Sequence, residues 1–424
     1  MSGDPAAYTI VPVTTAEAEA FLEVDQAAFF FEQAQPVDIA LSSLDLSRCY
    51  AATRNGGPPF AGVYGSHDMT VTIPAPGGGL RPVPMAGLTW VGVHPDERRR
   101  GLLTRMVRHH LEDMHRQGVA VGGLHASEPA IYGRFGYAVA SVEARLGLSR
   151  GAALTAPGLD DRAASVRTRL TWVDDPETAG LVHDLHVRLL GTQLGAVVRT
   201  EAMTRANARD WLPHRRDREA NRVLFAERDG ETVGYALLNR ASKWEDGSPR
   251  GALVCYELAA EDSGVLLALA RRLVDFDLIA TVTVEGRSLD DPVLWWAGGP
   301  RAVEVRVFDG VWLRLIDVGA AMAQRGYTVA VDVVLDVADP FCPWNEGRWR
   351  LRCEGSASAA TCERTDDAAD LRLPVQVLAS AYCGLRSVAS QARQGAVHEL
   401  TPGAVAALTT AMATADHPVA AVAF

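Results

Sequence analysis

A short basic turn is the first group of residues in this chain whose types and spacing could do chemistry. Arg98, Arg99, Arg100 and Gly101 are consecutive, and the apolar residues that follow from Leu102 recur at helical spacing. A helix that begins directly after such a turn presents free backbone N–H groups and the positive end of its dipole. This arrangement suits a pyrophosphate, although a surface turn before an ordinary helix would explain the arginines alone.

The elements on both sides of the turn favour the phosphate site. Thr89–Val93 is an apolar, β-branched run that predicts a strand, and Pro95 ends it. A helix is expected over Leu102–Arg116, and Val119–Leu124 predicts a second strand after it. Because strand, basic turn, helix and strand follow in this order, we interpret the turn as a phosphate site.

Two further groups could handle protons. A tyrosine with an unperturbed pKa near ~10 is protonated at neutral pH and can donate to a departing thiolate. Tyr132 and Tyr137 are the two candidates after the second strand. The segment His417–Phe424 is apolar and β-capable, with no charged residue after His417. Because most termini fray, this composition suggests that the tail is tied down, either on a sheet edge or in a site.

The stretch Thr89–Tyr137 resembles motif A of the GNAT (Gcn5-related) acetyltransferases, which binds acetyl-coenzyme A (acetyl-CoA). The family pattern Arg/Gln-x-x-Gly-x-Gly/Ala is met at Arg98 and Gly101 and departs at Leu103. One branch, the Eis-type (enhanced intracellular survival) N-acetyltransferases, is similar over a longer set of residues: Ala126–Glu128, Ile131–Tyr137 and the terminal Phe424.

The resemblance implies a role for each site residue. Tyr132 is the general acid, and Tyr137 is expected to pack. The C-terminal carboxylate of Phe424 is the general base, which requires burial or a relaying water because a free α-carboxyl has a pKa near ~3.5. The expected cofactor-binding residues are Val91, Val93, Arg98, Arg99, Arg100, Gly101, Leu102, Leu103 and Ser127. The expected substrate-binding residues are Trp90, His125, Arg134, Phe31 and Glu32. His125 and Arg134 are chosen by their position beside the motif, and a core histidine is an equal alternative for His125.

Three aromatic residues end the helix that is expected from Ala18. Aromatic side chains are usually packing material, so we interpret Phe29–Phe31 as core, with a substrate cleft as the alternative. In the Eis-type pattern this helix end carries an acidic residue that helps to hold the substrate amine, and Phe31 with Glu32 is the local match. Ala423 stands where the family carries a penultimate acid.

Three domains are predicted, within a mixed α/β (α+β) fold class. Residues 1–155 form the catalytic GNAT domain, with Val139–Ser149 as its last strand. Residues 156–308 repeat the order strand, strand, helix, strand. Acids in Glu257–Gly264 stand where a phosphate would bind, so this GNAT-like domain is expected to have lost the cofactor. Residues 309–424 resemble the sterol-carrier-like domain that closes Eis-type chains, although lipid carriage does not follow from that fold.

Composition limits the function classes. The 424 residues carry a net charge of −11, which argues against nucleic acid as a partner and fits a cationic substrate or simple solubility. No apolar run approaches the ~20 residues of a membrane span, and the N-terminus lacks signal-peptide features, so a cytoplasmic protein is expected. The six scattered cysteines are expected to be buried free thiols, with a disulfide or metal site among the four in the last third as the less favoured alternative. His109, His110 and His115 are expected to be solvated. We expect no metal site because no His-Glu-x-x-His motif is present.

These expectations combine into an acetyl-CoA-dependent N-acetyltransferase that acts on primary amines of cationic substrates. By resemblance, the substrates are aminoglycosides acetylated at more than one position, and the assembly is a homohexamer. One alternative is an N-acetyltransferase for protein lysines or polyamines that ignores aminoglycosides. The other is a lipid- or partner-binding protein with a relict cofactor site.

Overall fold

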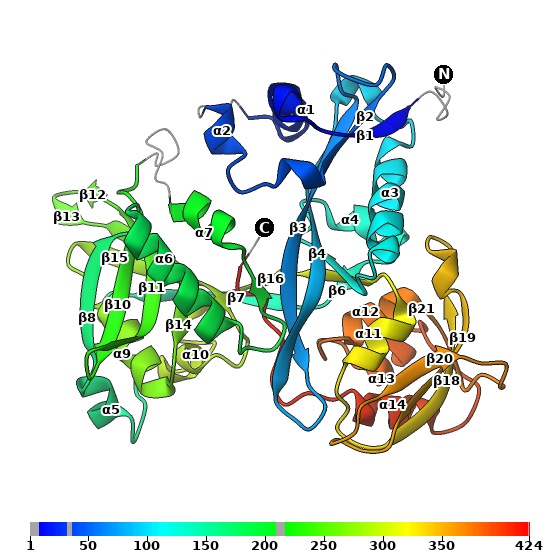
Figure 1. Cartoon of the computed structure of the whole chain (residues 1–424). Helices are drawn as coiled ribbons and strands as arrows, with labels where there is room; N and C mark the ends of the chain where they lie inside the picture. Colours follow the sequence, from blue (N-terminus) through cyan, green and yellow to red (C-terminus); the bar gives the residue numbers. More distant parts are fainter. Residues whose placement is uncertain (1–7, 32–35, 209–216, 423) are drawn as a thin grey trace. The chain divides into compact units, whose positions relative to one another are not determined.

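The computed structural model describes residues 8–31, 36–208, 217–422 and 424. The chain divides into two compact units. The first consists of Met1–Ala140, Val311–Ala415 and Phe424, and the second of Ser141–Gly310 and Asp416–Ala423. Both units contain helices and sheets, in agreement with the predicted mixed α/β class (Figure 1).

The main sheet of the first unit has the strand order β1-β2-β3-β4-β5-β17-β6. Strands β4 and β5 run parallel, so their connection is a crossover that contains a helix, α3. The other neighbours along this path are antiparallel. The strands are β1 (Thr9–Pro12), β2 (Cys49–Thr53), β3 (Gly62–Pro74), β4 (Leu80–Val93), β5 (Val121–Leu124), β6 (Ala138–Val139) and β17 (Trp312–Leu315).

Helix α3 (Leu102–Arg116) forms because apolar residues recur every three or four positions and give it one buried face. His110 lies on this face with 1% of its surface exposed, and burial lowers its pKa to about 3. The expectation that His110 is solvated is therefore wrong. The other helices of this part are α1 (Ala18–Phe29), α2 (Val37–Ala40) and α4 (Pro129–Tyr132).

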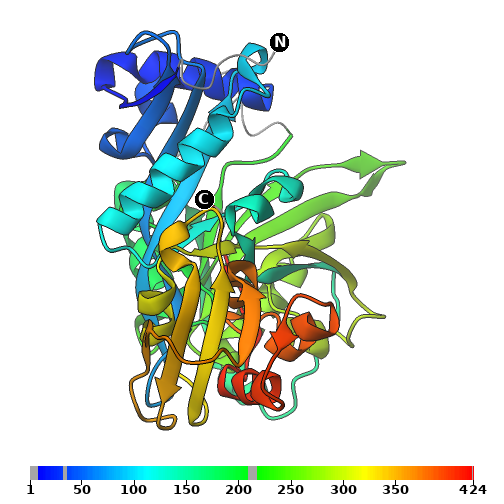
Figure 2. The same cartoon turned by 90° about the vertical axis from the view of Figure 1, so that its right-hand side faces the viewer.

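A second sheet of the first unit has the order β20-β19-β18-β21-β22. Its helices α13 and α14, drawn in red, are seen beside the yellow and orange strands in Figure 2. The strands are β18 (Val331–Ala338), β19 (Gly347–Cys353), β20 (Thr361–Arg364), β21 (Leu371–Pro374) and β22 (His398–Glu399). The helices are α11 (Val318–Gln324), α12 (Val375–Ala381), α13 (Val388–Arg393) and α14 (Ala404–Ala411).

The second unit has one main sheet, of order β16-β7-β15-β14-β11-β10-β8. Strands β14 and β15 are parallel and are joined through α9, which repeats the β4, α3, β5 order of the first unit. The strands are β7 (Val142–Ser149), β8 (Arg167–Trp172), β10 (Arg222–Arg228), β11 (Glu231–Ala241), β14 (Gly251–Ala260), β15 (Ile279–Arg287) and β16 (Glu304–Asp309). The helices are α5 (Asp160–Ala164), α6 (Pro176–Leu185), α7 (Glu201–Ala208), α9 (Ser263–Val274) and α10 (Pro292–Trp296).

One predicted strand lies in a different sheet from the one expected. Of Val139–Ser149, the residues Val142–Ser149 form β7, which pairs with β15 and β16 in the second unit. In the first unit, β17 lies between β5 and β6 instead. Both segments have strand-like sequences, so local patterning does not determine which sheet each one joins. The domain boundaries proposed from the sequence stay a prediction.

All six cysteines are buried and free, which confirms the expected buried thiols. Within the described ranges, no helix is long and apolar enough to cross a membrane. The same residues contain no group of three or more His, Cys, Asp or Glu side chains arranged to hold a metal ion.

Candidate active site

The basic turn leads into α3 with an unusual backbone. Arg99 and Gly101 both have positive φ, at 62° and 77°, a conformation that glycine adopts at little cost. Gly101 is the N-cap of α3, and no described side chain caps this helix end. The N–H groups of Leu102, Leu103 and Thr104 therefore keep their hydrogen-bonding capacity for another acceptor. With the helix dipole they form an anion site.

A cavity of about 530 Å³ opens at this helix end. It brings together most of the residues that the sequence predicts for the cofactor. The predicted cofactor residues that line it are Val91, Val93, Arg98, Arg99, Gly101, Leu102, Leu103 and Ser127. Tyr132 and Arg134 line the same cavity. The anion site and the predicted proton donor therefore share one space.

Arg100 is the exception among the predicted cofactor residues. It is absent from the lining of this cavity. Its Nη1 lies 2.6 Å from a carboxylate oxygen of Glu97 and donates to the hydroxyl of Tyr8 at 3.2 Å. Glu97 also pairs with Arg54 at 3.1 Å. Arg100 therefore stabilises the turn from outside the cavity.

Strand β4 is irregular where it reaches the cavity. Trp90 has a φ of 51°, and the β3–β4 register shifts so that Trp90 and Val91 together face Tyr64. This is a β-bulge, a device that re-aims a strand beside functional sites. The parallel pairing with β5 covers Met85–Gly87, so the last residues of β4 extend beyond it. An extended ligand arm could pair with the backbone there.

Tyr132 ends α4 with 7% of its surface exposed. Burial, with a smaller effect of Glu128, raises the pKa of Tyr132 to about 12. The phenol is therefore protonated at neutral pH and can act as a donor. Tyr137 packs in the core with 1% exposed, and its hydroxyl has no partner among the described residues. The expectation that Tyr137 packs is confirmed.

His125 and Phe424 lie together although they are far apart in the sequence. Their rings meet edge to face with centroids 4.9 Å apart. A Cβ on Gly87 would come within 2.9 Å of the Phe424 ring, so a glycine on β4 leaves room for this ring. The terminal residue is thus placed beside β4 and the residue that follows β5.

The substrate residues that the sequence predicts near α1 and that the structure describes are not found in the lining of the cavity. The Trp90 ring packs against Phe21 at 6.2 Å and does not line the cavity, and Phe31 is also outside its lining. Phe29 and Phe30 line the cavity with 43% and 87% exposed. The interpretation of Phe29–Phe31 as core is therefore wrong. Glu32 lies outside the described residues.

One acid of α1 was missed by the sequence analysis. Asp25 is 5% exposed, and burial raises its pKa to about 6. It lies one helical turn before Ala28, which lines the cavity. Helix α1 contains several acidic residues, and the sequence does not show which of them is buried. Only the structure distinguishes the buried Asp25 from the exposed Glu23.

In the second unit, the start of α9 corresponds to the start of α3 in the first. Asp262 caps α9 and accepts hydrogen bonds from the N–H groups of Gly264 and Val265, at 2.7 and 3.1 Å. Burial alone would raise the pKa of Asp262, but Arg228 and these N–H groups lower it to about 2. A carboxylate of the chain itself therefore fills the anion position, which agrees with a degenerate second domain.

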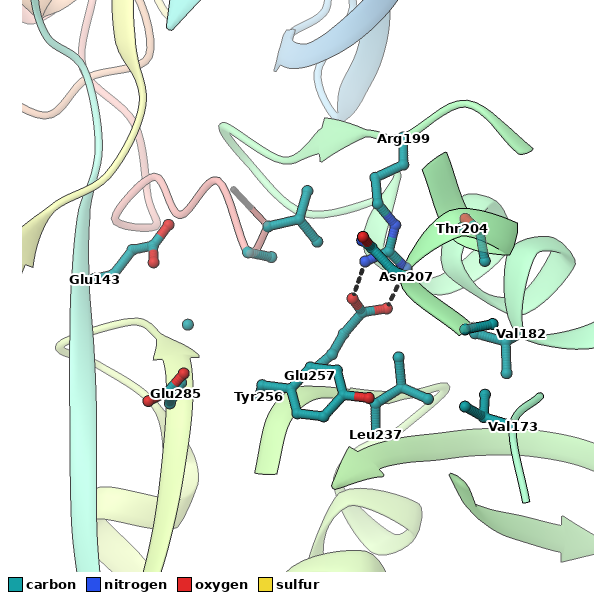
Figure 3. Close-up of a pocket in the computed structure, with 14 residues that line it drawn as sticks. Glu143, Val173, Val182, Arg199, Thr204, Asn207, Leu237, Tyr256, Glu257 and Glu285 are labelled. Carbon is teal, nitrogen blue, oxygen red and sulfur yellow. Dashed lines mark hydrogen bonds and ion pairs between the residues drawn. The ribbon is translucent and has the colours of Figure 1, made fainter. Parts of the chain in front are cut away.

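The second unit has a cavity of its own, of about 360 Å³ (Figure 3). Arg199 and Glu257 are paired in its wall through contacts of 2.5 and 3.0 Å. Burial, with Glu285 and Asp309 nearby, raises the pKa of Glu143 to about 7. This acidic, partly apolar wall was not predicted from the sequence.

The C-terminal tail is tied down, as its composition suggests. Within the second unit, the N–H of Val419 donates to the carbonyl of Leu194 at 2.9 Å. The carbonyl of Ala420 accepts from Val197 at 3.1 Å. Pro418 lies against Gly195, where a Cβ would come within 2.7 Å of it.

Comparison with known proteins assigns the chain to a family. Models of the acetyltransferase (GNAT) domain match residues 9–140 and 195–315, and a model of the sterol carrier protein domain matches residues 318–421. The chain is 39% identical over 364 residues to an uncharacterized N-acetyltransferase of Streptomyces avermitilis, covering 85% of this chain and 86% of that one. It is 31% identical over 346 residues to the N-acetyltransferase Eis of Mycobacterium tuberculosis, covering 78% of each chain. The chain belongs to the Eis-type N-acetyltransferases of the GNAT superfamily.

A solved structure supports this assignment. The crystal structure of Eis1 from Mycobacterium abscessus matches this Eis-type chain with a TM-score of 0.82 and 28% identity. The match covers 98% of this chain and 100% of that one. The chain is thus an acetyltransferase with two GNAT domains, the second degenerate, and a sterol-carrier-like domain, as the sequence predicts.

Proposed function

We propose that this protein transfers the acetyl group of acetyl-CoA to primary amines of small cationic substrates, in particular aminoglycosides, at more than one position. One observation carries the proposal. The uncapped N-terminus of α3 opens into the same cavity as Tyr132. An anion site and a protonated phenol in one cavity are what acetyl transfer from a pyrophosphate-containing thioester needs.

The cofactor would be held by backbone and side chains of the basic turn. The N–H groups of Leu102–Thr104 would bind the pyrophosphate, with Arg98 and Arg99 as charge partners. The backbone of Val91–Val93 would pair with the pantetheine arm. When bound, acetyl-CoA supplies the acetyl group as a thioester.

The protein's own groups would move the protons. Tyr132 keeps a proton on its hydroxyl oxygen at neutral pH because its pKa is raised to about 12. It could donate this proton to the sulfur as the thiolate departs. In this proposal the α-carboxylate of Phe424 is the base for the substrate ammonium, directly or through a water. The contact between Phe424 and His125 supports a place for this residue beside β4.

A cationic substrate is supported by charge. The net charge is −11, Glu128 lines the cavity, and Asp25 lies one helical turn before Ala28, which also lines it. A protein-lysine or polyamine N-acetyltransferase is the competing assignment, since Ala423 takes the place of an acid of the family. A lipid-binding protein with a relict cofactor site is less well supported because the α3 cavity keeps its anion site. A homohexameric assembly is part of the proposal by resemblance, and a cytoplasmic location is part of it as the expectation from the sequence.

A thiol-release assay tests the proposal across three substrate classes. Purified protein and acetyl-CoA are mixed with an aminoglycoside panel, spermidine and a lysine-containing peptide. We expect rapid thiol release with several aminoglycosides, weakened by added salt. Thiol release with spermidine or the peptide, but with no aminoglycoside, would favour the protein-lysine or polyamine assignment instead. No release with any amine, combined with no binding of acetyl-CoA in calorimetry, would favour the relict site.

A further inference from the structure

The turn that carries Tyr132 is short and rich in glycine. Helix α4 has four residues, and the next turn, Gly133–Phe135, ends at Gly136 with a φ of 86°. Helices of this length are not stable by themselves, and glycine adds conformational freedom. The position of the Tyr132 hydroxyl therefore depends on what holds the segment after it.

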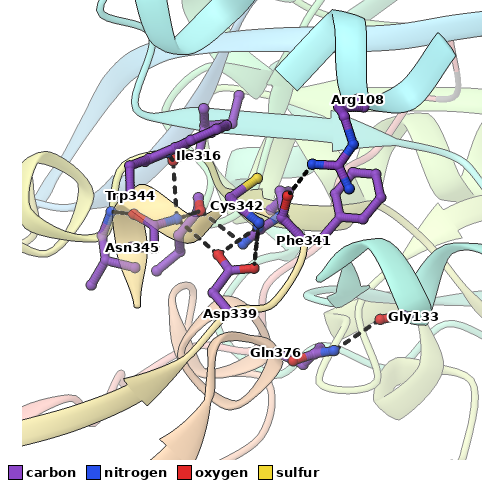
Figure 4. Close-up of polar contacts among 12 residues, drawn as sticks. Arg108, Gly133, Ile316, Asp339, Phe341, Cys342, Trp344, Asn345 and Gln376 are labelled. Carbon is purple, nitrogen blue, oxygen red and sulfur yellow. Dashed lines mark hydrogen bonds and ion pairs between the residues drawn. The ribbon is translucent and has the colours of Figure 1, made fainter. Parts of the chain in front are cut away.

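Two side chains of α12 bond to this segment. The Nε2 of Gln376 donates to the carbonyl oxygen of Gly133 at 2.8 Å (Figure 4). The hydroxyl of Ser380, which is fully buried, donates to the carbonyl oxygen of Val139 at 2.8 Å. Both acceptors are backbone atoms of the first GNAT domain, and both donors belong to the sterol-carrier-like domain. The segment is thus tied at its first residue and at its last strand.

A buried ion pair supports the middle of the segment. Arg314 of β17 is 0% exposed, and a Cβ on Gly136 would come within 2.6 Å of its guanidinium carbon. The guanidinium is fixed by Asp339, with contacts of 2.6 and 2.8 Å. Asn345 donates to Asp339 at 2.9 Å, as Figure 4 shows. These partners are also in the C-terminal part of the chain.

We propose that Gln376 is a positioning residue for Tyr132, through which the sterol-carrier-like domain sets the geometry of proton donation. Its amide fixes the carbonyl of Gly133, the residue directly after Tyr132, while Ser380 and Arg314 hold the rest of the segment. This inference rests on the proposed role of Tyr132 as the acid. It gives the third domain a function in catalysis that does not require a lipid ligand.

The first test compares two glutamine variants. Gln376→Met removes the amide at nearly constant volume, and we expect kcat to fall about tenfold with an unchanged KM for acetyl-CoA. Gln117→Met is the matched control, because its Nε2 also donates at 2.8 Å, to Asp113 at the exposed end of α3. Its kcat is expected to stay at the wild-type value. An equal loss in both variants, or no loss in Gln376→Met, overturns the proposal.

A rescue test separates positioning from stability. In Gln376→Glu the side chain can donate to Gly133 only when it is protonated. The ratio of its kcat to that of the wild type should therefore rise as the pH falls, while the ratio for Gln376→Met stays flat. A flat ratio for Gln376→Glu contradicts the proposal, and this variant keeps the test open if Gln376→Met does not fold.

A double variant distinguishes this inference from the function on which it rests. If Gln376 acts through Tyr132, adding Gln376→Met to Tyr132→Phe should not lower kcat further. Losses that multiply would overturn the positioning role while the acid assignment stands. Wild-type turnover by Tyr132→Phe alone would instead remove the acid assignment, and the positioning role with it.

Discussion

Two glycines with the same backbone conformation flank α3. Gly101 precedes the helix with a φ of 77°, and Gly118 follows it with a φ of 75°. Neither has an atom of the described chain within 4 Å of an added Cβ. An alanine in this left-handed conformation is strained by ~1–2 kcal/mol. At position 101 the chain can relieve the strain by rotating the helix start, which turns the N–H groups of Leu102–Thr104 away from the cavity.

The expected loss of acetyl-CoA affinity in Gly101→Ala follows from the hydrogen bonds that the pyrophosphate would lose. A hydrogen bond to a charged group contributes roughly 1.5–3 kcal/mol. Loss of one such bond to the pyrophosphate should therefore weaken acetyl-CoA binding by roughly ten- to hundredfold in Gly101→Ala. Gly118→Ala bears the same strain at the helix end that holds no candidate N–H group. Its affinity for acetyl-CoA should equal that of the wild type.

Calorimetric titration with acetyl-CoA and thermal unfolding together check this pair. Gly118→Ala should lose ~1–2 kcal/mol of stability and Gly101→Ala no more than this, while only Gly101→Ala loses affinity. Wild-type affinity in Gly101→Ala would refute the anion site at the start of α3. Weakened binding in Gly118→Ala would show that the loss comes from general destabilisation.

Three further results are expected. Tyr132→Phe should lower kcat by roughly 10²–10⁴-fold without weakening acetyl-CoA binding. Tyr137→Phe loses a hydroxyl without a described partner and should leave kcat unchanged. Steady-state kinetics of the two variants test both expectations. Burial raises the pKa of Asp25 from 3.8 to about 6, so the folded state favours the protonated acid, and the contribution of Asp25 to stability should be lost as the pH rises from about 4 through about 6. The stability of Asp25→Asn relative to the wild type should therefore rise over this pH range, and a difference that does not change with pH would contradict the assignment. Adding residues after Phe424 should abolish turnover, and full activity of the extended chain would remove its carboxylate as the base.

The sequence predicts best where the chemistry is local. The basic turn, α3 and Tyr132 lie within one stretch. Residue types and spacing there predict the anion site, and the family resemblance predicts Tyr132 as the donor. Eight of the nine predicted cofactor residues line the cavity. Arg100 is the predicted cofactor residue that does not line the cavity. The sequence cannot distinguish three adjacent arginines, and only the contacts with Glu97 and Tyr8 show that Arg100 points away from the cavity.

What the sequence did not predict depends on contacts between distant segments. Strand β7 and strand β17 have similar patterns, and their exchange between sheets is decided by long-range pairing. Phe29 and Phe30 are exposed and line the cavity although they are hydrophobic, and their residue type alone does not distinguish this from burial in the core. Gln376 carries no sequence signal at all, since a single glutamine at a helix start acquires meaning only when Gly133 is beside it.

The most direct measurement of the central claim is mass spectrometry of an aminoglycoside after incubation with acetyl-CoA and the protein. We predict a product that carries more than one acetyl group, each on an amine nitrogen, with one thiol released per group. The same incubation with Tyr132→Phe should yield far less product. An unmodified aminoglycoside under conditions where the protein binds acetyl-CoA would contradict the proposed substrate class.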